Sequence, residues 1–215
     1  MDLCRVRFGA KTLRFLGLTA VAIALPGVAQ AHHFMDGELP RTLTQGLLSG
    51  LAHPVVGVDH LAFIVAMGFL LATVKGGLWG VASFMSGTLA GAIVHLAKLG
   101  MPWGEVAVAL SVVGIAVLIV MRARVPLSWL APGLAIAGVL HGHAYAEAIF
   151  GAEPGPLAAY LAGFSMIQLA MAAAALGIHR RLRASAGRDV RSFSSALGAV
   201  VGVVGVYFLG LQAIA

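Results

Sequence analysis

The stretch 53–60, His53-Pro54-Val55-Val56-Gly57-Val58-Asp59-His60, places two histidines and an aspartate inside a long apolar run. That run covers residues 45–74 and exceeds the roughly 20 residues that a helix needs to cross a bilayer. A proline inside a helix removes one backbone hydrogen bond and clashes with the preceding turn. We therefore expect a membrane span that is kinked or broken near Pro54, with its main part running from Pro54 to Val74.

The composition of the whole chain points to the same environment. Of 215 residues, 60% are hydrophobic and 10% are charged, whereas soluble domains have about 45–50% apolar and about 25% charged residues. This excludes a soluble enzyme, and it excludes a disordered chain, which requires low hydrophobicity. Cys4 is the single cysteine, so neither an intrachain disulfide nor a thiolate metal cage can form.

The first 31 residues have the three parts of a secretory signal peptide: a basic start, a short apolar run over 15–25, and the small-x-small site Ala29-Gln30-Ala31. Cleavage there would give a mature chain that begins with His32 and His33. The alternative is an uncleaved first helix. Both interpretations deliver the segment 32–44 to the outside as a short periplasmic N-terminus.

Five more apolar runs of spanning length follow the first one. They cover residues 78–97, 104–121, 126–150, 156–178 and 192–214. The sequence therefore predicts an all-α integral membrane protein with six transmembrane helices after an N-terminal signal peptide. Its domains would be the signal peptide 1–31, the N-terminal segment 32–44 and a six-helix transport domain 45–215.

Lysine and arginine set the orientation, since they are enriched in cytoplasmic loops. With the mature N-terminus outside, eight of them fall in inner connections: Lys75, Arg122, Arg124, Arg180, Arg181, Arg183, Arg188 and Arg191. Two fall outside, Arg41 and Lys98. This predicts six helices with both mature termini on the outer side of the membrane. The basic run 180–191 could also bind anionic lipid or nucleic acid, but we interpret it as a cytoplasmic loop and expect no nucleic-acid partner.

Ionisable side chains inside membrane spans are costly and usually functional. Seven lie in or at the rims of the spans: His53, Asp59, His60, His95, His141, His143 and Glu147. No Lys or Arg lies among them to neutralise the carboxylates. Imidazole suits Ni, Co, Zn and Cu(II), and the two carboxylates together would cancel the charge of a divalent cation. The alternative is that each histidine caps a helix or satisfies a neighbour.

Spacing and depth both favour convergence of these groups. His53 and His60 are seven apart, which returns to nearly the same helix face, and His143 and Glu147 share a face at a spacing of four. His141 points away from His143 in a regular helix, although Gly142 could loosen that helix and turn both inward. With a rise of 1.5 Å per residue, the three helices carry their polar groups in the outer part of the membrane.

The sequence therefore predicts one intramembrane metal site. Its ligands are His53, Asp59, His60, His141, His143 and Glu147. A second tier comprises His95, Tyr145, His32 and His33. We expect a transition-metal cation as transported substrate, with no permanently bound cofactor and the lipid bilayer as a partner. Small-x3-small pairs, such as Gly87 and Gly91, allow close helix packing within one chain or in a homo-oligomer.

Three other functions use similar groups. An intramembrane zinc hydrolase would need an open ligand position, and Ser86 is its one candidate assisting residue. A haem-binding electron carrier would use paired histidines, but neighbouring carboxylates fit it poorly. A metal-binding membrane sensor would hold the ion without transporting it.

The polar motifs resemble those of the HupE/UreJ family of nickel/cobalt permeases, over most of the chain. The first motif is His53-x5-Asp59-His60, and the second is His141-Gly142 with Glu147. The second departs from the family pattern, which has another His followed by Gly and a Glu further on. Here Tyr145 and Ala146 occupy that stretch, the Glu is one residue closer, and His143 is added. The resemblance implies uptake of Ni²⁺ or Co²⁺ across a bacterial inner membrane to supply metalloenzymes or cobalamin synthesis.

The two motifs also indicate a mechanism. His53 and His141 lie in the first and fourth spans, which run in opposite directions, as in an inverted 3+3 repeat with the site between its halves. The chain has no nucleotide-binding loop of the form G-x4-G-K-[ST]. Transport therefore needs an ion gradient, the membrane potential or a separate ATPase, and we expect a secondary transporter.

Overall fold

The computed structural model describes residues 38–186 and 189–214. The chain divides into two units, residues 1–30 and 31–215, and everything below concerns the second. The predicted signal peptide, together with His32 and His33, lies outside the described residues.

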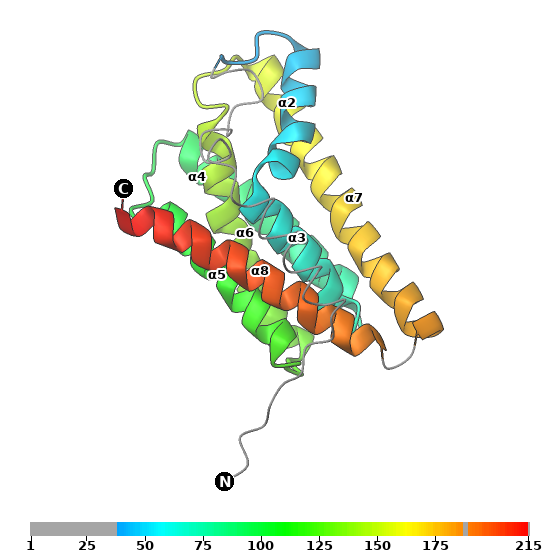
Figure 1. Cartoon of the computed structure of the whole chain (residues 1–215). Helices are drawn as coiled ribbons and strands as arrows, with labels where there is room; N and C mark the ends of the chain where they lie inside the picture. Colours follow the sequence, from blue (N-terminus) through cyan, green and yellow to red (C-terminus); the bar gives the residue numbers. More distant parts are fainter. Residues whose placement is uncertain (1–37, 187–188, 215) are drawn as a thin grey trace. The chain divides into compact units, whose positions relative to one another are not determined.

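The described part of the chain is entirely helical and contains no strand (Figure 1), which confirms the predicted fold class at this level. Its seven helices are α2 (Leu43–Val56), α3 (Val58–Leu71), α4 (Gly77–Leu96), α5 (Gly104–Val120), α6 (Leu127–Glu147), α7 (Pro154–Ala186) and α8 (Asp189–Ile214). Each predicted apolar run matches one helix, except the first, which matches the pair α2 and α3.

Three described helices are long and apolar enough to cross a membrane, namely α4, α7 and α8. The bent pair of α2 and α3 makes a fourth if it counts as one span. Helix α5 is apolar but has 17 residues. Helix α6 has 21 residues, and its hydropathy is lowered by the histidines and the glutamate near its C-terminal end.

The first run breaks at Gly57 and not at Pro54, so the predicted position of the break was wrong by three residues. Pro54 lies inside α2, where it removes a single backbone bond. Gly57 accepts an extended conformation, with φ −70° and ψ 97°, between the last bond of α2 and the first turn of α3. The two helices meet there at a bend of 76°.

Glycines set the principal helix pairs. A Cβ on Gly87 or on Gly91 would lie 2.2 or 2.0 Å from a carbonyl oxygen of α6. Gly46 and Gly50 have equally close contacts with α7, at 2.2 Å each. These four glycines therefore allow the small-residue packing predicted from their spacing, and within the described part they use it inside one chain. Both pairs are parallel, because contact positions rise together along the two helices.

Helices α5 and α8 form the third principal pair, and they run antiparallel. Gly198 at the start of α8 packs on Ile119 near the end of α5, whereas Gly205 packs on Val113 further back. Figure 1 shows α8 crossing alongside α5. The three principal pairs are therefore α2 with α7, α4 with α6, and α5 with α8.

A buried apolar cluster joins these pairs, and it contains Phe63 and Phe84, whose rings stack at 5.1 Å. The outside of the helices is apolar as well. All three tryptophans, Trp79, Trp103 and Trp129, lie at the starts of helices and are 74–80% exposed. Tryptophan gathers at membrane–water interfaces, so their positions fit helices whose ends lie at the two surfaces of a bilayer.

Candidate metal site

The break at Gly57 brings the first motif together. His53 lies in the last turn of α2, and Asp59 and His60 lie in the first turn of α3. The two histidine rings are 6.1 Å apart, although the helix between them is not continuous. A Cβ on Gly57 would lie 2.7 Å from the His60 ring, so the position has room for hydrogen alone.

His60 meets His141 of α6, and their Nδ1 atoms are 2.8 Å apart. The Nε2 of His141 lies 2.9 Å from the Ser111 hydroxyl of α5, which itself donates to the Val108 carbonyl. Since that hydroxyl has one proton, it accepts from His141 Nε2–H. His141 Nδ1 then carries no proton, and its lone pair faces His60. Because the Ser111 hydroxyl donates its proton to the Val108 carbonyl, it donates none to a neighbouring base, and Ser111 is unsuited to act as a nucleophile.

Asp59 is a buried carboxylate, with 2% of its surface exposed. Its Oδ1 accepts from the backbone N–H of His60 at 2.9 Å, at the N-terminus of α3, where the helix dipole favours negative charge. The described Lys and Arg residues all lie at helix ends or in connections, and none pairs with Asp59. The carboxylate thus has hydrogen-bonding support but no cationic partner among the described side chains.

Two tyrosines pack against these histidines. Tyr145 is fully buried, and its ring lies 4.4 Å from that of His60 and 5.2 Å from that of His53. Its hydroxyl has no partner among the described residues. Tyr160 of α7 donates to the Tyr145 carbonyl at 2.8 Å.

We call His53, Asp59, His60 and His141 the buried group.

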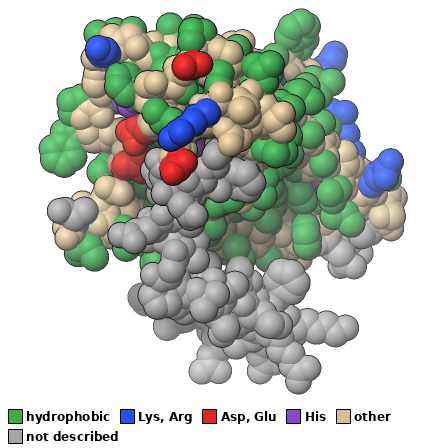
Figure 2. Space-filling model, turned by 90° about the horizontal axis from the view of Figure 1, so that it is seen from above, with side chains coloured by type: hydrophobic (Ala, Val, Ile, Leu, Met, Phe, Trp, Pro, Cys, Tyr) green, Lys and Arg blue, Asp and Glu red, His purple; other side chains and the backbone are tan. Residues whose placement is uncertain are grey.

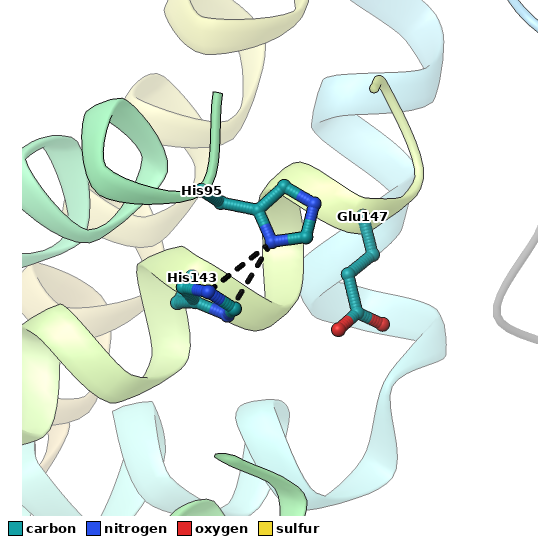
Figure 3. A group of neighbouring side chains, drawn as sticks. All are labelled: His95, His143 and Glu147. Atoms are coloured by element: carbon teal, nitrogen blue, oxygen red, sulfur yellow. Dashed lines mark hydrogen bonds between the residues drawn. The ribbon is translucent and has the colours of Figure 1, made fainter. Parts of the chain in front are cut away.

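The other predicted ligands form a second group at the end of α4 and α6, shown in Figure 3. His95 Nδ1 lies 3.3 and 3.4 Å from the two ring nitrogens of His143. One ligand atom each from His95, His143 and Glu147 lies within 4.8 Å of the others. Of the described residues, these alone form such a trio of histidine and carboxylate donors. We call them the rim group.

Helix α6 stays regular through Gly142, so the expected loosening of this helix was wrong. Gly142 instead lets α4 approach, since its Cβ would lie 1.9 Å from the Thr88 carbonyl oxygen. His141 and His143 consequently point to different helices. The single predicted ligand set is thus divided into two groups, with Asp59 in one and Glu147 in the other.

Sequence reasoning missed three polar residues. Ser111 and Tyr160 contact the buried group. Gln168 of α7 is 1% exposed, and neither atom of its amide has a partner among the described residues. Ser111 could have been found as the one polar residue in the interior of the apolar run 104–121, which otherwise has only Glu105 near its start. Ser86, proposed as an assistant in a hydrolase, is exposed and donates to the Ala82 carbonyl of its own helix, so it touches neither group.

The two ends of the helices differ in charge. One end has a cavity of about 1030 Å³ with basic residues in its lining: Lys75, Arg122, Arg124, Arg183 and Arg191. The other end has four exposed acidic residues: Glu38, Glu105, Glu147 and Glu153. Figure 2, viewed from that end, shows acidic side chains near one another with a basic side chain between them and small patches of histidine surface beside them. The rim group lies at this acidic end.

The chain is similar in sequence to known proteins. The family described as HupE / UreJ protein matches residues 19–208. Protein HupE of Rhizobium leguminosarum bv. viciae is 32% identical over 129 residues, which is 59% of this chain and 64% of that protein. The chain thus matches less than two thirds of its relative's length. No solved structure matches the chain significantly.

Proposed function

Because the chain belongs to the HupE/UreJ family of nickel/cobalt permeases, which are transporters and not enzymes, we propose that it takes up Ni²⁺ or Co²⁺ across a bacterial inner membrane. The observation that carries the proposal is the close pair of buried imidazoles, His60 and His141, with the buried Asp59 carboxylate on the residue that precedes His60. A buried charge is costly unless it is paired or binds a metal. A cation that passes through supplies that partner.

The geometry of the histidine pair supports a metal ligand role. With metal–nitrogen bonds of about 2.1 Å, two ligands at a right angle are about 3.0 Å apart. The observed 2.8 Å between the two Nδ1 atoms is close to this spacing. A dication would displace the proton shared by His60 and His141, and Ser111 would keep holding His141 from its far side. Such outer hydrogen bonds orient a ligating histidine.

We propose that six spans cross the membrane: α2 with α3, then α4, α5, α6, α7 and α8. The packing supports an inverted repeat of three spans each. In such a repeat the first three spans correspond in order to the last three, so that α4 corresponds to α7 and α5 to α8. The pair α4–α6 then corresponds to the pair α7–α2, and the antiparallel pair α5–α8 corresponds to itself. His53 and Asp59 are six positions apart in the sequence, and so are His141 and Glu147. Transport would then proceed by tilting one half against the other around the buried group.

The charge difference between the ends supports the direction of transport. Basic residues favour the cytoplasmic side, so we assign the acidic end to the periplasm, as the predicted orientation of the mature termini requires. A dication is attracted to the acidic end from the periplasm. It then gains about 4.6 kcal/mol per 100 mV on entering a negative interior, twice the value for a single charge. We therefore propose the membrane potential as the driving force.

Uptake of radiolabelled Ni²⁺ and Co²⁺ by cells with and without the protein tests this proposal. His60→Ala should reduce uptake to background while its membrane abundance stays near that of the wild type. His179→Ala is the matched control, since it removes a histidine that is also buried, at 3% exposure, but near the basic end. Equal uptake by cells with and without the wild-type protein would contradict transport. A fully active His60→Ala variant would remove the buried group from the mechanism.

A further inference from the structure

We infer that the rim group is a separate metal-binding site that loads the buried group from the periplasmic side. The inference rests on the proposed uptake of a dication and adds a second, chemically distinct site to it. His95, His143 and Glu147 would bind the ion there with three protein donors. The remaining coordination positions would be left to water.

The two groups are separated by the geometry of α6. His141 and His143 are two residues apart on a continuous helix, so their side chains diverge by about 200°. His141 points to His60 of α3 and Ser111 of α5. His143 points to His95 of α4. One ion therefore cannot use both histidines while α6 stays helical.

Close packing of α4 on α6 builds the rim group. A Cβ on Gly91 would lie 2.0 Å from the Val139 carbonyl and 2.8 Å from the His143 backbone nitrogen. His95 lies one turn after Gly91, so this contact sets its ring beside that of His143, with centroids 4.5 Å apart. Glu147 lies one turn after His143 on α6. Figure 3 shows the three side chains on the same side of the two helix ends.

The hydrogen bonds prepare one histidine for a metal. His143 Nε2 lies 3.1 Å from the Leu99 carbonyl oxygen, which can only accept, so Nε2 carries the proton and Nδ1 has the free lone pair. A backbone carbonyl commonly orients a ligating histidine in this way. His95 Nδ1 lies 3.4 Å from His143 Nδ1 and 3.3 Å from His143 Nε2, so it sits against the face of that ring, and one imidazole must turn for both nitrogens to face one ion.

Exposure fits a loading role. His143 is buried, His95 is half-buried and Glu147 is exposed, whereas every member of the buried group is at most 8% exposed. An ion at the rim group can keep part of its water shell, while an ion at the buried group must lose most of it. Shedding water in two steps avoids one large desolvation cost. This end carries four exposed acidic residues against two exposed basic ones, Arg41 and Lys98. Its net negative charge raises the local concentration of cations.

Binding stoichiometry tests the inference without relying on transport. We would titrate the purified full chain in lipid nanodiscs with Ni²⁺ alone, using calorimetry and metal analysis. Wild type should bind two Ni²⁺ per chain, and His95→Ala and His60→Ala should bind one each. Glu153→Gln, which removes another exposed carboxylate at the same end, should still bind two. His95→Gln keeps the side-chain size and should behave like His95→Ala, which excludes misfolding as the cause.

Uptake kinetics separate this inference from the proposed function. His95→Ala should raise the KM for Ni²⁺ uptake about tenfold and leave the maximal rate within twofold, whereas His60→Ala should lose the rate. If wild type binds two Ni²⁺ but transports none, the rim site stands and the transport proposal falls. A wild type that binds one Ni²⁺, or a His95→Ala variant that still binds two, overturns the rim site.

Discussion

The buried group and the rim group use the same donors, imidazole and carboxylate, in different surroundings. In the buried group, Asp59 is 2% exposed and has no cationic side chain among its described neighbours. In the rim group, Glu147 is exposed to solvent. The two groups share α6, where His141 serves one and His143 serves the other. The difference shows that two residues on one helix can divide a single polar motif between two environments.

Burial decides what a bound ion contributes in each place. A carboxylate that is removed from water loses several kcal/mol of solvation unless a cation or hydrogen bonds compensate it. An exposed carboxylate keeps its hydration and is screened by salt within about 8–10 Å. The buried group therefore needs the ion electrostatically, while the rim group can bind and release it with a small change in solvation. An ion that enters from outside would thus meet first the site where it loses little water and then the site where it loses most of it.

The largest expected effect comes from removing each group's carboxylate charge. Asp59→Asn should bring Ni²⁺ uptake to background, since the buried group loses its only negative charge. Glu147→Gln should retain the maximal rate and raise the KM about tenfold, because the rim group keeps two imidazoles. Radiolabelled uptake over a range of Ni²⁺ concentrations measures both. Equal losses in the two variants would remove the distinction between the groups.

Gly142→Ala should damage both groups at once. Its Cβ would lie 1.9 Å from the Thr88 carbonyl oxygen, so α4 and α6 would have to separate, and both histidines that flank it would shift. Overpacking of this kind costs about 3 kcal/mol, which lowers Tm by roughly 6–12 °C for a chain of this size. Gly133→Ala is the matched control on the same helix, with no atom within 4 Å of the added methyl group.

Thermal unfolding of the two purified variants checks this expectation. Gly133→Ala should match or slightly exceed the wild type, since alanine is the better helix former. A Tm for Gly142→Ala that equals that of Gly133→Ala would show that the helices are free to part. The rim and buried groups would then not depend on this contact.

Much of the fold could be predicted from apolar runs, because their length and composition are local properties. The position of the break could not. A proline in a helix removes one bond and lets the helix continue, as Pro54 does. The helix ends at Gly57, because the His60 ring of the next turn occupies the space that a side chain at position 57 would fill. The argument that His53 and His60 share a face assumed a continuous helix, yet the 76° bend still brings their rings within 6.1 Å.

The candidate site was predicted as residues but not as an arrangement. Imidazoles and carboxylates inside apolar runs are visible in the sequence, so all seven members of the two groups were named. Their division depends on which helix each side chain of α6 faces. That in turn depends on the contact of Gly91 with Val139, 48 residues away. No local pattern reports such a distance, which is why His95 was placed in a second tier.

Ser111→Ala should affect the buried group and leave the rim group intact. The hydroxyl of Ser111 accepts from His141 Nε2–H, and loss of an outer hydrogen bond to a ligating histidine typically lowers metal affinity 10–100-fold. We expect about a tenfold weaker affinity for one of two Ni²⁺ ions in calorimetry. Ser86→Ala removes an exposed serine that bonds only within its own helix, and it should change neither affinity. Weakening of both sites by Ser111→Ala would contradict two independent groups.

The smallest expected effect is that of pH on capture at the rim group. A histidine must be neutral to bind a metal, and its ordinary pKa is about 6.5. Protons compete with the metal for the imidazole nitrogens as the pH falls. The KM of Ni²⁺ uptake should therefore be higher at pH 6.5 than at pH 7.5 in the wild type. In His95→Ala, where capture no longer requires both imidazoles, the rise should be smaller. An equal rise in both proteins would place the pH-sensitive step at the buried group instead.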